Sequence, residues 1–151
     1  MNEDRVPLSK ALVGTWILLS REDRTREGRP HSDPGLGNDP IAILIYDGAG
    51  NFAAQFMKRD RSTLVQAAAQ GSGPNNSRAQ GGYDAYFGTY TVDDRQGTVT
   101  QRLVGALSQE NVGMVLTRTM TIEGGELTIR LGTTALDGAS VVRTLRWRKA
   151  A

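Results

Sequence analysis

The stretch IAILIYDGAGNFAAQFMK, from Ile41 to Lys58, decides the fold class of this chain. Its first part, 41–47, is rich in β-branched and apolar residues, and its second part, 51–58, has the period-two pattern of a strand. Between them, DGAGN contains the Asp-Gly signal of a tight hairpin turn. The sequence therefore predicts two antiparallel strands here and, with them, an all-β fold.

The same alternation recurs on both sides of this hairpin, and stretches with a helical period are rare. The short links DDRQG, EGG and LDGA have turn chemistry, so sequence neighbours are expected to pair antiparallel. We expect one turn of helix within 7–12, a single short helix at 62–69 after the third strand, and polar loops at 22–40 and 70–82. With the hairpin, eight strands are predicted, at 13–21, 41–47, 51–58, 85–93, 98–107, 112–123, 126–132 and 140–149.

Length and composition narrow the classes of protein that remain. The 151 residues suit a single domain over 1–151, and with no cysteine there is no disulfide or thiolate site. The chain has one histidine, His31, which excludes zinc sites that need two or more histidine ligands. We expect no metal and no cofactor. The net charge of +2 and the short apolar runs favour neither a nucleic-acid nor a membrane partner. We expect a cytoplasmic monomer or homodimer.

Eight antiparallel strands in sequential order can remove their edges by closing into an up-and-down barrel or by folding into a sandwich. An eight-stranded barrel has an interior wide enough for side chains or one small ligand.

Motifs along the chain form an ordered set. LVGTWILLS at 12–20 contains Gly-x-Trp. GNDPIAILIYDGAGNFAAQFMKRDR at 37–61 has a Gly-Asp-Pro approach, an apolar strand ending in Tyr, a glycine turn and an Ala-Gln-Met strand. YDAYFGTYTVD, VLTRTMTIEGGELTI and RTLRWRK complete the set, which resembles the bacterial and fungal lipocalin-like domain family. The resemblance implies an eight-stranded lipocalin-like β-barrel with an internal cavity. Family members often have histidine in the fifth strand, where this chain has Gln101 and Arg102.

Two arginines are expected to point into the barrel, because Arg118 and Arg143 each interrupt an apolar face. An unpaired buried charge costs several kcal/mol, and carboxylates are concentrated in loops and at strand ends. Three solutions stay open. A ligand carboxylate or enolate binds both arginines; a phenolic or carbonyl ligand binds Tyr90 and Gln55; or an arginine covers the ring of Trp16 at one end of the barrel.

Inward positions of the predicted strands give the candidate site. The sequence leaves open whether Gln55 or the two phenylalanines of 51–58 face inward. Arg118 and Tyr90 are also the candidates for catalysis. The candidate ligand-binding residues are Tyr46, Gln55, Tyr86, Tyr90, Met114, Leu116, Arg118, Met120, Arg143 and Leu145.

Two function classes fit this site, and a third uses none of it. The barrel could bind a small, mainly hydrophobic molecule with a polar or anionic end. It could instead be a cofactor-independent cyclase or isomerase that acts on a polyketide- or terpenoid-like substrate in a biosynthetic pathway. An internal cavity smaller than ~300 Å³ would count against both. In the third class, side chains fill the barrel of a structural protein.

Overall fold

The computed structural model describes residues 6–32, 35–61, 80–135 and 138–151. Its elements are α1 (Leu8–Ala11), β1 (Gly14–Arg24), β2 (Pro30–His31), β3 (Ile41–Tyr46), β4 (Asn51–Met57), β5 (Tyr83–Asp93), β6 (Thr98–Ala106), the 3₁₀ turn η1 (Gln109–Asn111), β7 (Val115–Glu123), β8 (Glu126–Thr134) and β9 (Ser140–Lys149). The predicted all-β class is confirmed. The expected helix at 62–69 lies outside the described residues.

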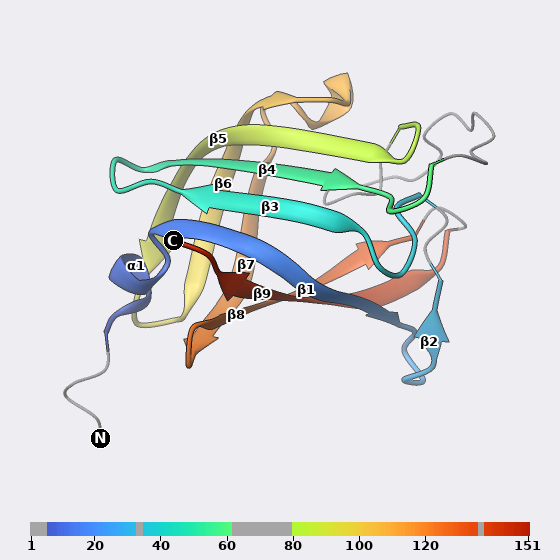
Figure 1. The fold of residues 1–151 in the computed structure, drawn as a ribbon, viewed down its shortest axis with the longest axis horizontal. Coiled ribbons are helices and arrows are strands. Elements are labelled where there is room, and N and C mark those ends of the chain that lie inside the picture. The colour runs from blue at the N-terminus through green and yellow to red at the C-terminus, as the bar shows by residue number, and fades with distance from the viewer. Residues whose placement is uncertain (1–5, 33–34, 62–79, 136–137) are drawn as a thin grey trace.

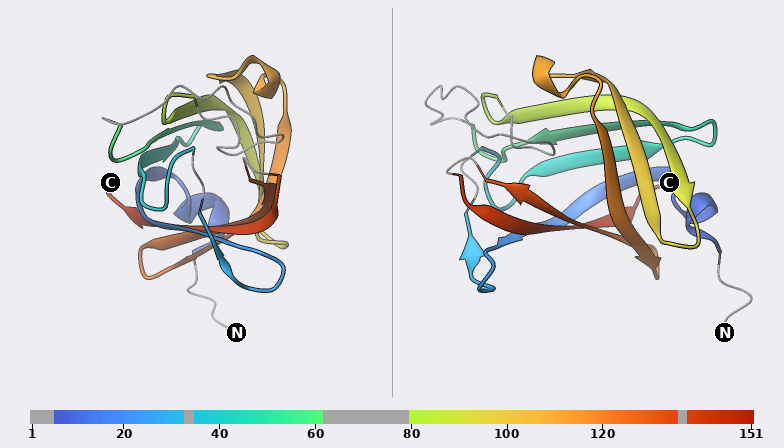
Figure 2. Two further views of the ribbon diagram at one scale, coloured as in Figure 1. Left: turned by 90° about the vertical axis from the view of Figure 1, so that its right-hand side faces the viewer. Right: turned by 180° about the vertical axis from the view of Figure 1, so that it is seen from behind.

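Eight of these strands close into an antiparallel barrel. Each pairs with the next in the order β1-β3-β4-β5-β6-β7-β8-β9, and β9 also pairs with β1, so the ring has no open edge. Figure 2 shows this closed ring in its left-hand view, nearly along the barrel axis. The predicted up-and-down barrel is therefore confirmed. The hairpin of β3 and β4 also forms as expected, with Ile45 opposite Ala53.

The prediction of a loop over 22–40 is partly wrong. β1 continues to Arg24, and β2 pairs with that end of β1, so that His31 lies opposite Asp23. A β-bulge between Leu18 and Ser20 shifts the register of β1 against β9 by one residue. Such a shift exchanges the two faces of a strand, so Asp23 lies inside the barrel although the simple alternation from the start of β1 places it outside.

The segment before β7 also differs from the expectation. Residues 112–114 are not part of the strand, because the chain makes the short turn η1 and enters β7 only at Val115. Val112 is exposed as a result, whereas Leu116, Arg118 and Met120 alternate inward as predicted.

Helix α1 lies at one end of the barrel, on the left of Figure 1, and β2 lies toward the other end. Ser9 connects α1 to the β5–β6 turn, because both its backbone N–H and its hydroxyl donate to the carboxylate of Asp94. These two hydrogen bonds lower the pKa of Asp94. Just beyond the helix, the indole N–H of Trp16 donates to the carbonyl of Leu12, which fixes the tryptophan ring in the core.

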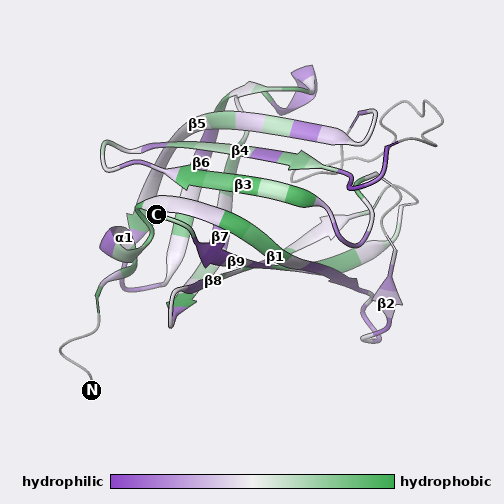
Figure 3. Cartoon of the chain, in the orientation of Figure 1, coloured by the Kyte–Doolittle hydropathy of each residue, from purple (hydrophilic) through white to green (hydrophobic). Residues whose placement is uncertain are grey.

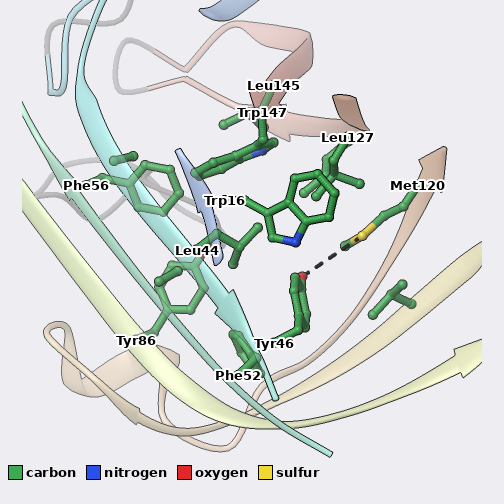
Figure 4. Close-up of a cluster of buried hydrophobic side chains, with 14 of the residues drawn as sticks. Trp16, Leu44, Tyr46, Phe52, Phe56, Tyr86, Met120, Leu127, Leu145 and Trp147 are labelled. Carbon is green, nitrogen blue, oxygen red and sulfur yellow. Dashed lines mark hydrogen bonds between the residues drawn. The ribbon is translucent and has the colours of Figure 1, made fainter. Parts of the chain in front are cut away.

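Large aromatic side chains fill the barrel interior. Figure 4 shows Trp16, Tyr46, Phe56, Tyr86 and Trp147 among aliphatic neighbours. The ring of Phe56 lies edge-on to that of Trp147, with centroids 5.8 Å apart, and stacks on Tyr86 at 6.2 Å. Both tryptophans are fully buried, so their expected place in the core is confirmed.

In the part of the chain that the structure describes, no helix is both long and apolar enough to span a membrane.

Candidate functional site

Four polar side chains come from four strands into the centre of the barrel. Tyr46 ends β3, Tyr86 lies midway along β5, Gln101 is on β6, and Arg118 is on β7. Each occupies an inward position of its strand, and each is nearly or fully buried. The ion pair of Asp23 and Arg143 is also buried, but neither residue lines the space between these four side chains, so the four decide which ligand chemistry that space accepts.

Arg118 is the least satisfied of the four. Only 9% of its surface is exposed, and one guanidinium nitrogen, Nη1, makes a marginal 3.5 Å contact with the carbonyl oxygen of Thr117. The other nitrogen, Nη2, is buried and has no hydrogen-bond partner among the described residues. Burial lowers the pKa of Arg118, since the charged form loses its hydration.

Tyr46 and Gln101 form a second part of the site. The side-chain amide of Gln101 donates to the hydroxyl oxygen of Tyr46, and the Tyr46 hydroxyl in turn points to the sulfur of Met120 at 4.0 Å (Figure 4). A thioether is a weak acceptor. Burial raises the pKa values of Tyr46 and Tyr86 well above the ordinary tyrosine range, so both keep their protons and remain donors.

The enclosed space between these groups is small. Its volume is about 20 Å³, which is room for one water molecule. The expectation of a preformed cavity of at least ~300 Å³ is therefore wrong for the described interior, because the aromatic side chains occupy that space. The lining residues are Leu44, Tyr46, Phe56, Tyr86, Gln101, Arg118, Met120, Ile129, Leu145 and Trp147.

The comparison with known families agrees with this geometry. The family model of the lipocalin-like domain matches residues 13–150, which is nearly the whole chain. The chain belongs to the lipocalin-like domain family. Its barrel suggests small-molecule binding in general. No curated protein matches the sequence.

Arg143, which the sequence analysis placed in the site of this lipocalin-like domain, lies outside the cavity lining and has a carboxylate partner. It is fully buried, and its Nε and Nη2 donate to the two carboxylate oxygens of Asp23 at 2.7 and 2.8 Å. The expectation that internal carboxylates are scarce fails at Asp23, which the bulge in β1 turns inward. Nor does Arg143 cover Trp16, whose ring instead has the ammonium of Lys149 5.3 Å from its centroid.

Four further candidates do not line the cavity of the lipocalin-like domain. Gln55 is exposed on the outer face of β4 and accepts a hydrogen bond from Tyr83, because Phe52, Ala54 and Phe56 occupy the inner face. The Tyr90 hydroxyl donates to the backbone carbonyl of Asp47 at 2.6 Å, at the β3–β4 turn. Met114 and Leu116 pack against the core outside the lining set.

Five candidates do line the cavity: Tyr46, Tyr86, Arg118, Met120 and Leu145. Gln101 is the polar residue that the sequence analysis missed. It alternates with Val99 and Leu103, both buried, and this pattern of one amide between two apolar inward positions was the signal for it.

Among the residues that the structure describes, no group of three His, Asp or Glu side chains is placed to hold a metal ion.

Proposed function

We propose that this lipocalin-like domain binds a small, mainly apolar molecule inside the barrel, with a hydrogen-bond-accepting end of that molecule at Arg118. The observation that supports this most strongly is the buried Nη2 of Arg118, which has no partner among the described residues. Leaving such a group without an acceptor costs several kcal/mol, and a ligand carboxylate, enolate or carbonyl would remove this cost.

The neighbouring groups favour an acceptor for the same reason. Among the described residues, the hydroxyl proton of Tyr46 points to the Met120 sulfur, and the Gln101 amide already donates to Tyr46. The cavity lining therefore contains donor side chains from four strands and no carboxylate. An anionic oxygen fits this arrangement better than a cation or a second donor does.

The size of the cavity sets a condition on binding. About 20 Å³ accommodates one ligand oxygen or methyl-sized group, so the body of the ligand must displace side chains. Arg118 and Met120 both line the space and both have long, unbranched side chains with several rotatable bonds. We expect these two to move while the aromatic wall stays in place.

The two buried tyrosines are not suited to moving protons at neutral pH. A cyclase or isomerase that moves protons needs a group whose pKa lies near the working pH. Burial moves the pKa values of Tyr46 and Tyr86 in the opposite direction. A cytoplasmic location and a place in a biosynthetic pathway remain predictions.

A titration with butanoate, hexanoate and octanoate, and with the matching alcohols, tests the proposal. Trp147 lines the cavity, so its fluorescence reports occupancy. We expect octanoate to bind more tightly than butanoate, because each buried CH₂ contributes about 0.8 kcal/mol. We expect Arg118→Met to weaken octanoate binding about tenfold or more, since a charge-assisted hydrogen bond contributes roughly 1.5–3 kcal/mol, and to leave octanol binding nearly unchanged.

Arg130→Met is the matched control, because Arg130 is exposed on the outer face of β8. It should bind octanoate as the unmodified protein does. If Arg118→Met and Arg130→Met bind octanoate equally well, Arg118 does not hold the acceptor end and the proposal fails.

A further inference from the structure

Trp147, like Arg118, has a buried donor without an acceptor in the part of the chain that the structure describes. It lies on β9 between Arg146 and Arg148, which are exposed, and this end of the strand is purple in Figure 3. Trp147 itself is only 1% exposed and lines the same enclosed space as Arg118. A buried N–H that lacks an acceptor lowers the stability of the fold, so a ligand acceptor at this position would be favourable.

The two tryptophans of the core differ in their hydrogen bonding. The indole N–H of Trp16 donates to the carbonyl of Leu12 at 2.9 Å. Trp147 lies opposite Leu18 of β1 and Leu127 of β8, so neither neighbouring strand has a side-chain acceptor at the paired position. Buried indole N–H groups usually have a partner. The N–H of Trp147 is therefore left for a ligand, whereas that of Trp16 is already used by the fold.

The register places these two donors, Arg118 and Trp147, on opposite sides of Met120. Met120, Ile129 and Leu145 lie opposite one another across β7, β8 and β9. Arg118 precedes Met120 by two residues, whereas Trp147 follows Leu145 by two residues on a strand that runs in the same direction. At ~3.3 Å per residue, the Cα atoms of Arg118 and Trp147 are about 13 Å apart along the strands. A ligand body that displaces Met120 would thus have one donor toward each end.

We propose that the ligand has a second, neutral acceptor several bonds from its anionic end, and that the indole N–H of Trp147 donates to it. This inference rests on the proposed function, because it takes Arg118 as the site of the anionic end. Among the described lining residues, Arg118 is the one cation, so a second carboxylate would have no counter-charge at Trp147. A ketone or ester carbonyl accepts a hydrogen bond without adding a proton that needs its own acceptor. The ligand class is then an oxo acid with a hydrocarbon chain between its two oxygen-bearing groups.

Calorimetric titration with octanoate, and with octanoates that have a ketone at C4, C5, C6 or C7, tests the inference. We expect at least one of these oxo acids to bind the unmodified protein about threefold to tenfold more tightly than octanoate does, as a net hydrogen bond allows. Trp147→Phe keeps an aromatic ring but removes the donor. It should reverse the preference, because the buried ketone would then have no partner.

Trp16→Phe is the matched control, since it makes the same exchange at an indole that already has an acceptor. It should keep the preference for the oxo acid. Nuclear magnetic resonance of the ¹⁵N-labelled unmodified protein gives a second measurement that needs no variant. The indole proton of Trp147, assigned through its contact with Phe56, should move downfield with the preferred oxo acid and less with octanoate.

The outcomes separate this inference from the proposed function. If octanoate binds through Arg118 but no oxo acid is preferred, or if the preference survives Trp147→Phe, the inference is wrong and the proposed function stands. An indole signal of Trp147 that responds equally to octanoate and to the oxo acids also overturns the inference. If octanoate does not bind through Arg118, the proposed function fails and this inference fails with it.

Discussion

In the unliganded protein, the buried guanidinium of Arg118 lowers the stability of the fold, and ligand binding would offset this loss. Its guanidinium is buried on the inner face of β7 and lacks a hydrogen-bond acceptor at Nη2 among the described residues. Removing the charge while keeping the length of the side chain should therefore stabilise the fold. A residue kept for binding at the expense of stability is common at functional sites.

We expect Arg118→Met to raise the free energy of unfolding by about 1 kcal/mol or more, measured by urea denaturation at neutral pH. Arg130→Met should change it by less than about 0.5 kcal/mol, since Arg130 is exposed. A clear loss of stability in Arg118→Met would show that the guanidinium already has a strong partner in the folded protein, and would contradict the account.

At the scale of the strands, a buried ion pair crosses the seam between β1 and β9. Asp23 and Arg143 lie directly opposite each other, and both point inward. Removing one member of such a pair leaves an uncompensated charge, whereas removing both does not. The pair thus behaves differently from Arg118, which has no carboxylate opposite it.

Asp23→Asn should lower the free energy of unfolding by roughly 3–5 kcal/mol, because it removes the negative charge that accepts from Nε and Nη2 of the buried Arg143. The double variant Asp23→Leu, Arg143→Met should recover most of that loss. Glu22→Gln is the control on the outer face of the same strand, where the side chain is exposed. If Asp23→Asn and Glu22→Gln unfold alike in urea, the pair does not stabilise the seam.

The same seam shows what the sequence could and could not predict. The ends of β9 were predictable, because Ser140–Lys149 alternates without interruption. The bulge near Leu18 was not, since no residue there requires one and it depends on pairing with β9, a strand more than a hundred residues away. The inward position of Asp23, and so the partner of Arg143, depends on that bulge.

For the whole molecule, strand order left a barrel and a sandwich open, and the resemblance to the lipocalin-like domain family implied the barrel. Neither predicted how the interior is filled. Alternation correctly placed Tyr46, Arg118 and Met120 inside. It could not give the volume that remains once the rings of Trp16, Phe56 and Trp147 pack together, because that depends on rotamers and on neighbouring strands. The result is a tightly packed barrel with a few polar groups at its centre.

This packing predicts how the whole fold responds to alkaline pH. Burial raises the pKa values of Tyr46 and Tyr86, so the folded state holds these two protons more tightly than the unfolded chain does. Their contribution to stability is complete below the ordinary tyrosine pKa of about 10 and declines as the pH rises above it.

Tyrosinate absorbance and circular dichroism, followed together from pH 8 to about 12, measure this effect. We expect the tyrosinate absorbance of Tyr46 and Tyr86 to appear only as the circular dichroism signal is lost. Tyr46→Phe should reduce the size of this late rise in absorbance. Complete ionisation of the tyrosines in a protein that is still folded would show that the interior is open to water.

The central claim is that Arg118 holds the acceptor end of a ligand inside the barrel, and a crystal structure of the complex with octanoate tests it most directly. The account predicts a carboxylate within hydrogen-bond distance of the Arg118 guanidinium, with Met120 displaced and Arg143 still bound to Asp23. Octanoate bound outside the barrel, or in the barrel with its carboxylate turned away from Arg118, would contradict it.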